Sequence, residues 1–288
     1  MVITVTGSTG TIGSELVSLL SAAAVPTRAV LRNVRSVRPL ANVVWLQADL
    51  ADTLLLEPAL AGTTRLFLLT GNEQGFARLQ IDVVRAAEGA GVQHVVKLSA
   101  FGASPHSNSG IAREHWEVEQ ALREQTAMTW TMLRPHAFMQ NWLGDVAESV
   151  RAEGVIHSPI GDGRVPFIDT RDIAEVAAEA LLDPEAHAGR KYYLSGGEAV
   201  GYAEVAAAIS EVIGKPVRYE PISMEDARAG MEARGTPPYL VDATLAIAAY
   251  QKAGGPTATV SDQVRRILGR PPRTLRDFAR DYAEHFKS

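Results

Sequence analysis

The chain has 288 residues, of which 46% are hydrophobic and 21% are charged. These fractions are typical of globular proteins, so they argue against a disordered or fibrous chain and allow a sizeable buried core. The absence of cysteine excludes a disulfide scaffold, an iron–sulfur cluster and a cysteine nucleophile. A formal net charge of −5 gives no basic field for nucleic acid, and no apolar run reaches the length of a membrane span. We therefore expect a cytoplasmic protein without nucleic acid or membrane partners.

Short β-branched runs alternate with longer amphipathic stretches over the first half of the chain. We expect strands at residues 2–6, 29–31, 43–46, 66–69 and 95–98, and helices at residues 12–20, 54–60 and 76–90. Strands that alternate with helices predict βαβ units and a parallel sheet covered on both faces. The predicted fold class is α/β, with a Rossmann-like doubly wound parallel sheet.

The second half of the chain adds two expected strands and then becomes rich in helices. The strands are expected at residues 130–133 and 192–194, and the helix-rich part begins at about Gly201. We therefore expect a dinucleotide-binding Rossmann domain over residues 1–146, to which residues 165–195 return. Residues 147–164 and 196–288 would form a smaller, helix-rich substrate-binding lobe.

A glycine-rich turn stands near the N-terminus, with the sequence Thr6-Gly7-Ser8-Thr9-Gly10-Thr11-Ile12-Gly13. It follows an expected strand and opens an expected helix, which is the context of a dinucleotide-binding turn. Gly7 would permit the tight turn, Gly10 would let the backbone approach a pyrophosphate, and Gly13 would allow the helix to pack closely on the sheet. The free N–H groups of the helix would then bind phosphate. A glycine turn without a ligand is the alternative.

The G-x-x-G-x-x-G spacing resembles that of the extended and atypical short-chain dehydrogenases/reductases, and further segments resemble the NmrA-like group. These segments are Val30-Leu31-Arg32-Asn33, Gln47-Ala48-Asp49-Leu50, Ala90-Gly91-Val92-x-His94, Leu133-Arg134-Pro135-x-x-Phe138-Met139-Gln140-Asn141, Ile168-Asp169-x-Arg171-Asp172-Ile173-Ala174 and Gly269-Arg270-Pro271-Pro272-Arg273-Thr274. The resemblance thus covers nearly the whole chain. It is strongest to members of the NAD(P)H azoreductase, NADPH:quinone oxidoreductase and triphenylmethane reductase types, and it implies an oxidoreductase.

Arg32 follows the second expected strand, where sites that prefer NAD(H) carry Asp or Glu about 20 residues beyond the glycine turn. No acidic residue is nearby, and Arg28, Arg35 and Arg38 add positive charge to the same stretch. A guanidinium can hold the 2′-phosphate of NADP(H) with two parallel hydrogen bonds. We therefore favour NADP(H) over NAD(H), with a solvated arginine edge as the alternative, and we expect neither flavin nor metal.

Other cofactor contacts are implied mainly by the resemblance. They are Asp49, Thr70, Gly71, Lys97, Ser99 and Pro135. Ligands of open α/β sheets bind beyond the carboxyl ends of the strands, which is where these residues are expected. Asp49 could instead cap the following helix. Asp169 and Asp172 have the spacing of a metal pair, but they belong to the family pattern, so we expect capping or ion pairing there.

The Tyr-x-x-x-Lys pair of the usual short-chain dehydrogenases does not occur in this sequence. By resemblance, His115 occupies a position where some related reductases carry a catalytic lysine, and a histidine can donate a proton near neutral pH. His115 and Glu119 are also an i,i+4 pair and could simply hold each other on the helix. Quinones, azo compounds and cationic dyes accept hydride onto a conjugated system, and water can supply the proton, so the missing tyrosine favours such acceptors.

His136, Phe138, Met139 and Trp142 follow an expected strand and offer stacking and apolar surface to a flat aromatic acceptor. Phe138 and Trp142 could instead pack in the core. The leading hypothesis is an NADPH-dependent reductase of a small aromatic acceptor. The alternatives are an NmrA-like redox-sensing regulator with a protein partner, and a reductase or isomerase of specialised metabolism. A homodimer is left open.

Overall fold

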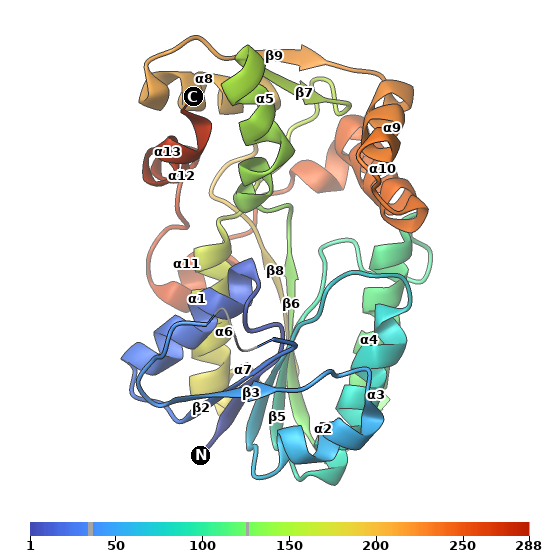
Figure 1. Cartoon of the computed structure of the whole chain (residues 1–288), viewed down its shortest axis with the longest axis vertical. Helices are drawn as coiled ribbons and strands as arrows, with labels where there is room; N and C mark the ends of the chain where they lie inside the picture. Colours follow the sequence, from blue (N-terminus) through green and yellow to red (C-terminus); the bar gives the residue numbers. More distant parts are fainter. Residues whose placement is uncertain (34–36, 125–126, 288) are drawn as a thin grey trace. The chain divides into compact units, whose positions relative to one another are not determined.

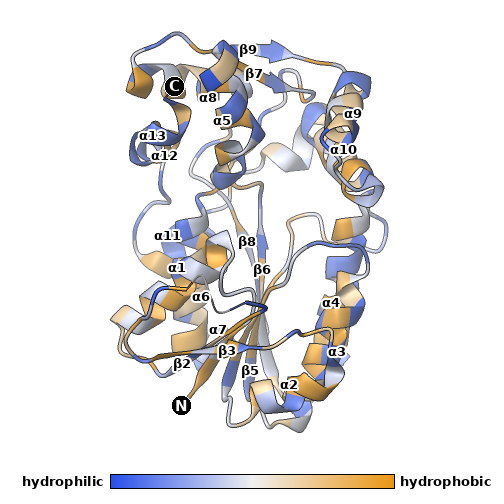
Figure 2. Ribbon diagram, in the orientation of Figure 1, coloured by the Kyte–Doolittle hydropathy of each residue, from blue (hydrophilic) through white to orange (hydrophobic). Residues whose placement is uncertain are grey.

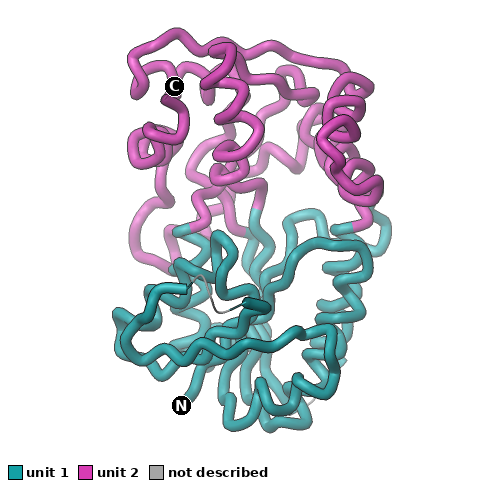
Figure 3. Tube along the Cα trace, in the orientation of Figure 1, with its two compact units in different colours: residues 1–107, 111–135, 171–193 teal, residues 108–110, 136–170, 194–288 magenta. Residues whose placement is uncertain are grey.

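The computed structural model describes residues 1–33, 37–124 and 127–287, and the chain forms two compact units (Figure 3). Unit 1 comprises Met1–Ser107, Ile111–Pro135 and Arg171–Tyr193, whereas unit 2 comprises Asn108–Gly110, His136–Thr170 and Leu194–Ser288. In the described part of the chain, no helix combines the length and the apolar character needed to cross a membrane.

The boundaries of the two units differ from those expected from the sequence. Residues 136–146 were expected with the Rossmann domain, but they belong to unit 2, because Met139 and Trp142 are packed in the hydrophobic core of that unit. The segment that returns to unit 1 is Arg171–Tyr193, which is shorter than the expected 165–195.

Unit 1 is built on a seven-stranded sheet with the strand order β3-β2-β1-β4-β5-β6-β8. The strands are β1 (Ile3–Val5), β2 (Thr27–Leu31), β3 (Val43–Gln47), β4 (Arg65–Leu68), β5 (His94–Leu98), β6 (Thr129–Pro135) and β8 (Arg190–Leu194). From β3 to β6, each strand pairs in parallel with its neighbours. This order, which reverses beside β1, is that of the Rossmann fold, so the predicted α/β class is confirmed.

Helices cover both faces of this sheet (Figure 1). They are α1 (Thr11–Ala22), α2 (Thr53–Leu60), α3 (Phe76–Gly89), α4 (Gly110–Glu124), α6 (Thr170–Leu182) and α7 (Pro184–His187). Figure 1 shows α1 and α6 on one side of the strands and α3 and α4 on the other. On the α3–α4 side, Leu66, Val95 and Met132 of the strands are buried against apolar helix residues. Figure 2 shows hydrophobic stretches along α3 and α4. Burial of this apolar surface is the main stabilising contribution.

Unit 2 combines a small parallel sheet with helices of varied length. Its elements are η2 (Met139–Leu143), α5 (Asp145–Glu153), β7 (Val155–Ser158), α8 (Tyr202–Ile213), β9 (Arg218–Pro221), α9 (Met224–Ala233), α10 (Pro238–Ala253), η3 (Gly255–Ala258), α11 (Gln263–Leu268), α12 (Leu275–Asp281) and α13 (Ala283–Phe286). Its core is centred on Trp142, whose ring lies 4.8 Å from that of Phe167 and 5.4 Å from that of Phe278.

Candidate functional site

The glycine turn joins β1 to α1, and close contacts fix two of its glycines. Gly7 has a φ of +61°, which disfavours any side chain, and a Cβ at Gly13 would lie 2.1 Å from the Gly7 carbonyl oxygen. Gly10 differs, because its backbone is extended and a Cβ there would lie 3.3 Å from the same oxygen. Gly7 and Gly13 therefore shape the turn, whereas the backbone conformation of Gly10 is open to other residues.

The amino end of α1 is open to an anion. Gly10 is the N-cap, no side chain caps the helix, and its first turn holds no acidic residue. Residues 9–11 are exposed, whereas Ile12 is buried and Ser8 donates a hydrogen bond of 2.7 Å to the Val30 carbonyl. Uncapped N–H groups at the positive end of a helix dipole suit a phosphate, so the turn fits the pyrophosphate of a dinucleotide.

Arg32 directly follows β2 and is exposed. Arg28 on the same strand does not add its charge at this point, contrary to the expectation, because its guanidinium donates to two carbonyls of segment 59–61 at 2.9 Å each. Arg38 is exposed, and Arg35 lies outside the described residues. Arg32 is therefore the best-placed described cation for a 2′-phosphate at the end of β2.

Asp49, Thr70 and Gly71 follow the carboxyl ends of β3 and β4. Asp49 is exposed, and the alternative that it caps α2 is wrong, because Asp52 is the N-cap of that helix. The Thr70 hydroxyl accepts a hydrogen bond of 2.7 Å from the Gln80 amide, and Gly71 is exposed. These residues border the same edge of the sheet as the glycine turn, which is where open α/β sheets bind ligands.

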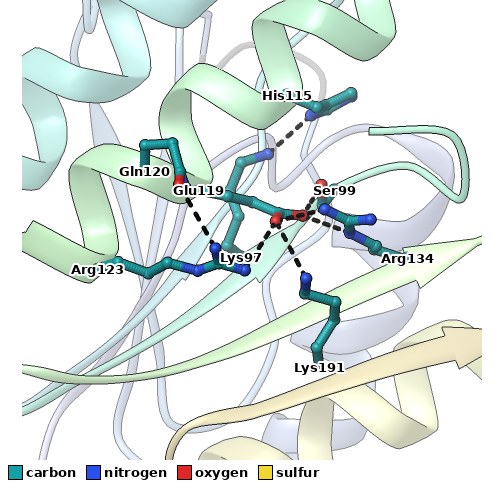
Figure 4. Close-up of polar contacts among 8 residues, drawn as sticks. All are labelled: Lys97, Ser99, His115, Glu119, Gln120, Arg123, Arg134 and Lys191. Carbon is teal, nitrogen blue, oxygen red and sulfur yellow. Dashed lines mark hydrogen bonds and ion pairs between the residues drawn. The ribbon is translucent and has the colours of Figure 1, made fainter. Parts of the chain in front are cut away.

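Lys97 and Ser99, at the end of β5, direct their side chains into unit 1 (Figure 4). The Lys97 side chain is completely buried, and its Nζ donates to the Leu98 carbonyl oxygen and lies 3.0 Å from His115 Nδ1. Burial lowers the pKa of Lys97 to about 7. The Ser99 hydroxyl donates a bond of 2.6 Å to Glu119 Oε1. Neither side chain reaches solvent, so a cofactor would meet the backbone at this strand end.

The Glu119 carboxylate of α4 is paired with Arg134, which stands one residue before Pro135 at the end of β6. Arg134 Nε donates to Oε1 at 2.7 Å, and Arg134 Nη2 donates to Oε2 at 2.6 Å. Lys191 and Arg123 lie 4.0 and 3.8 Å from Oε2. Burial by itself raises the pKa of Glu119, but the hydrogen bonds from Arg134 and Ser99 outweigh it, so the pKa is lowered. Glu119 thus pairs with Arg134, and the alternative that Glu119 and His115 hold each other on the helix is wrong.

We call the group Lys97, Ser99, His115, Glu119 and Arg134 the buried cluster. His115 is 5% exposed, and its ring centroid lies 4.8 Å from that of Phe76, the first residue of α3. The preceding residue of α4, Glu114, accepts hydrogen bonds from two N–H groups at the start of α3. The pKa of His115 is lowered well below its usual value, mainly by burial and then by the charges of Lys97 and Arg134. The ring is therefore held as neutral imidazole.

The four residues expected at the substrate pocket all lie in unit 2. His136 is buried, which lowers its pKa to about 4, and Phe138 is half-buried. Met139 and Phe167 line a cavity of about 280 Å³ within this unit. Trp142 is 1% exposed and packs against Phe167, which is the core alternative stated for it. Of the four residues, Phe138 is thus the more accessible one and Met139 faces the cavity, whereas His136 and Trp142 are buried.

The acidic pair Asp169 and Asp172 is completely buried. Asp169 accepts a hydrogen bond of 2.8 Å from the Gln140 amide, whose oxygen accepts from the Thr170 N–H at the start of α6. Within residues 1–33, 37–124 and 127–287, no group of three or more acidic or histidine side chains forms a cation site. Through the Gln140 amide, Asp169 is thus linked to the backbone at the start of α6.

Sequence reasoning missed the Glu119–Arg134 ion pair and the Lys97–His115 contact. A usable signal existed, because Lys97 stands in an apolar strand and Arg134 ends another. Charged residues are rarely buried unless they are paired, so a charge in a strand expected to be covered on both faces implies a partner. The pattern does not say which partner, because residues from three elements meet there.

Comparison with known proteins shows the family to which the chain belongs. It matches the NmrA-like family over residues 1–250. It is 38% identical to NAD(P)H azoreductase from Xenophilus azovorans over 286 residues, with 99% of each chain covered. It is 37% identical over 289 residues to the (4-alkanoyl-5-oxo-2,5-dihydrofuran-3-yl)methyl phosphate reductase of Streptomyces griseus subsp. griseus, again with 99% of each chain covered.

Among solved structures, the chain resembles the NADPH-dependent quinone oxidoreductase of Escherichia coli in complex with NADPH. The TM-score is 0.84 at 29% identity, and the match covers 96% of this chain and 98% of the other. The chain therefore belongs to the NmrA-like family, and the resemblance inferred from its motifs is confirmed.

Proposed function

We propose that this member of the NmrA-like family is an NADPH-dependent reductase that transfers hydride to a small conjugated acceptor, such as a quinone or an azo compound. The observation that carries the proposal is the end-to-end similarity to NAD(P)H azoreductase. The resemblance to a quinone oxidoreductase in complex with NADPH supports the same reaction class and the same cofactor.

The residues of unit 1 fit the cofactor at separate points. The N–H groups at the open end of α1, around Gly10, would hold the pyrophosphate, and Arg32 would hold the 2′-phosphate. Asp49 and Gly71, exposed beyond β3 and β4, would border the rest of the molecule, with Pro135 at the end of β6. When bound, NADPH supplies the hydride.

A conjugated acceptor suits a protein without the Tyr-x-x-x-Lys pair. Hydride addition to such an acceptor moves an electron pair onto an atom stabilised by conjugation, so protonation need not precede hydride transfer. Catalysis then rests mainly on holding the two reactants in contact. Phe138, Met139 and His136 are our candidates for contacting the acceptor, and His115 is our candidate for delivering a proton.

The second relative suggests one more acceptor to test. Its name describes a reductase of a 5-oxo-2,5-dihydrofuran, a ring in which a carbon–carbon double bond is conjugated with a carbonyl group. This is again a conjugated electrophile, and it carries no aromatic ring. A reductase of specialised metabolism therefore remains the second candidate, with the same hydride chemistry on a different substrate.

The test is NADPH oxidation with a quinone, an azo dye, a conjugated lactone and a saturated ketone. We expect oxidation with at least one conjugated acceptor and none with the saturated ketone. NADPH binding without oxidation in the presence of any acceptor would refute the reductase and favour a redox-sensing regulator. Assembly as a homodimer and a cytoplasmic location stay predictions.

A further inference from the structure

Lys97 and His115 form a buried contact between an amine and an imidazole. In the described part of the chain, the Lys97 amine has two hydrogen-bonding neighbours, the Leu98 carbonyl oxygen and His115 Nδ1 at 3.0 Å. The carboxylate of the cluster, Glu119, forms a bidentate ion pair with Arg134. Lys97 therefore lacks the carboxylate contact that normally keeps a buried lysine charged.

The hydrogen-bonding partners of Lys97 fix the position of the ring proton on His115. An ammonium group only donates, and the Leu98 carbonyl oxygen only accepts. As an ammonium group, Lys97 donates to both of its neighbours, so His115 Nδ1 must be the accepting nitrogen. A neutral imidazole carries one N–H, which is then on Nε2. Figure 4 shows the Lys97 side chain extending from β5 to this ring.

We propose that Lys97 is a positioning residue that holds His115 as the Nε2–H tautomer and passes its own proton to Nδ1 when the Nε2 proton leaves. This rests on the proposed function, in which the hydride acceptor must finally take up a proton. In this step the Nε2–H bond breaks as an N–H or O–H bond forms on the reduced acceptor. A Nδ1–H bond forms as a Lys97 Nζ–H bond breaks. His115 stays neutral, Lys97 changes from ammonium to amine, and water later returns its proton.

The surroundings of the pair suit this role. Burial lowers the pKa of Lys97 to about 7, and the charge of Glu119 on α4 opposes this shift. Arg134 on β6 lies near enough to disfavour a charged His115, and Lys191 on β8 faces Glu119 rather than the ring. On the α3 side, His115 contacts the apolar ring of Phe76. A proton donor with a pKa near the working pH is the most effective kind, and Lys97 has such a pKa.

The first test determines the His115 tautomer by NMR in the absence of any reaction. Protein labelled with ¹⁵N-histidine would be titrated across the neutral range, with the ring signals of His115 assigned by comparison with His115→Gln. We expect the Nε2–H tautomer at the acidic end, and a shift of the Nδ1 signal with a midpoint near 7 as Lys97 loses its proton. A Nδ1–H ring at the acidic end, or no midpoint in the range, would overturn the proposal.

The second test compares Lys97→Met with Lys191→Met, a lysine of the same neighbourhood that does not contact His115. Lys97→Met should lose the Nδ1 midpoint, lower kcat by roughly tenfold or more and remove the decline of kcat above neutral pH. Its KM for NADPH should stay unchanged, and Lys191→Met should keep both the midpoint and the pH profile. A folded Lys97→Met protein with the original pH profile and Nδ1 midpoint would contradict us.

The two tests separate this proposal from the proposed function. If no acceptor is reduced but the Nδ1 midpoint occurs and depends on Lys97, the reductase function fails and the coupling of Lys97 to His115 stands. If acceptors are reduced but the midpoint is absent, the reductase stands and the coupling is refuted. Should Lys97→Met fail to fold, the titration of the unaltered protein decides alone.

Discussion

The glycine turn and the buried cluster of unit 1 present polar groups in opposite ways. In the turn, the polar groups are backbone N–H groups on an exposed helix end, and Gly7 and Gly13 contribute by having no side chain. In the cluster, the polar groups are the side chains of Lys97, Glu119 and Arg134, which are buried. The comparison teaches that a backbone site is sensitive to added atoms, whereas a buried charge is sensitive to a missing partner.

The largest effect on binding is expected at the turn, from Gly10→Val. The backbone of Gly10 is extended and a Cβ there would lie 3.3 Å from the Gly7 carbonyl oxygen, so valine needs only a small shift of the turn, but its side chain would occupy the exposed end of α1. Loss of about two charge-assisted hydrogen bonds to phosphate should weaken NADPH binding roughly a hundredfold or more. Calorimetry would measure the binding and circular dichroism the fold. Tight binding by the folded variant would show that phosphate binds elsewhere.

Gly13→Val is the matched control for this prediction. A Cβ at Gly13 would lie 2.1 Å from the Gly7 carbonyl oxygen, so the turn itself must move. We expect Gly13→Val to lose folded protein, whereas Gly10→Val loses binding alone. If both variants fold equally well, the glycines do not differ in the way that the contacts indicate.

The second prediction concerns the stability of the buried cluster and is tested by removing one partner of the Glu119–Arg134 ion pair. Arg134→Met leaves the Glu119 carboxylate buried without its two hydrogen bonds from the guanidinium, which should cost about 3–5 kcal/mol in the free energy of unfolding. Changing Glu119→Leu as well should recover much of this loss, since the unpaired carboxylate is then absent. Urea unfolding would measure both variants.

An exposed ion pair provides the control for the Arg134 prediction. Arg78 and Asp82 form a pair of 3.2 Å on the surface of α3, with the Arg78 side chain 82% exposed. Arg78→Met should change the free energy of unfolding by less than about 1 kcal/mol. A similar cost at Arg78 and Arg134 would mean that burial does not set the strength of these pairs.

The sequence predicted the turn better than the cluster, for a physical reason. The contacts of Gly7, Gly10 and Gly13 lie within one local strand–turn–helix unit, so their spacing alone carries the geometry. The strands of unit 1 were predictable for the same reason, because each is a continuous apolar run. Arg28 shows the limit, since it stands near Arg32 in the sequence yet bonds to the segment around residue 60.

The cluster depends on contacts between elements that are distant along the chain. Ser99, Glu119 and Arg134 come from the ends of two strands and from the helix between them. The i,i+4 rule suggested that His115 pairs with Glu119, but Lys97 and Arg134 take these partners instead. A local rule ranks neighbours on one helix, and it cannot weigh a buried guanidinium that the sheet brings to the same carboxylate.

The third prediction concerns Arg32, at the same edge of the sheet as the glycine turn, and the preference for NADPH over NADH. Arg32→Ala should weaken NADPH binding by roughly 1.5–3 kcal/mol, because a charge-assisted bond to the 2′-phosphate is lost, and NADH binding should change little. Arg38→Ala, another exposed arginine of the same stretch, is the control and should have a smaller effect. Binding of both cofactors would be measured by fluorescence titration. Equal affinity of the unaltered protein for NADPH and NADH would contradict the assignment.

The last prediction concerns a second buried polar group on β5, His94, at the end opposite Lys97. His94 Nε2 lies 3.1 Å from the Thr131 hydroxyl and Nδ1 lies 2.7 Å from the Thr129 hydroxyl. The Thr131 hydroxyl also donates to the carbonyl of His187 at 2.8 Å, and the Thr129 hydroxyl donates to the carbonyl of Gln93 at 3.2 Å. Burial, and then the charge of Arg65, lowers the pKa of His94 to about 4. Unlike the Lys97 amine, which contacts another titratable group, the His94 ring has the hydroxyls of Thr129 and Thr131 as its neighbours.

The sign of the pH dependence follows from this lowered pKa. The unfolded chain takes up a proton on His94 near pH 6.5, whereas the folded protein does so only near 4, so acid favours the unfolded chain between these values. The stabilising effect of the neutral ring is complete above 6.5 and is lost as the pH falls toward 4. His94→Gln should therefore flatten the decline of unfolding free energy over this range, by up to about 1.4 kcal/mol per pH unit for one proton. Urea unfolding at several pH values would measure the slopes, with His106→Gln on an exposed loop as the control. An unchanged slope in His94→Gln would mean that this ring takes up its proton equally in both states.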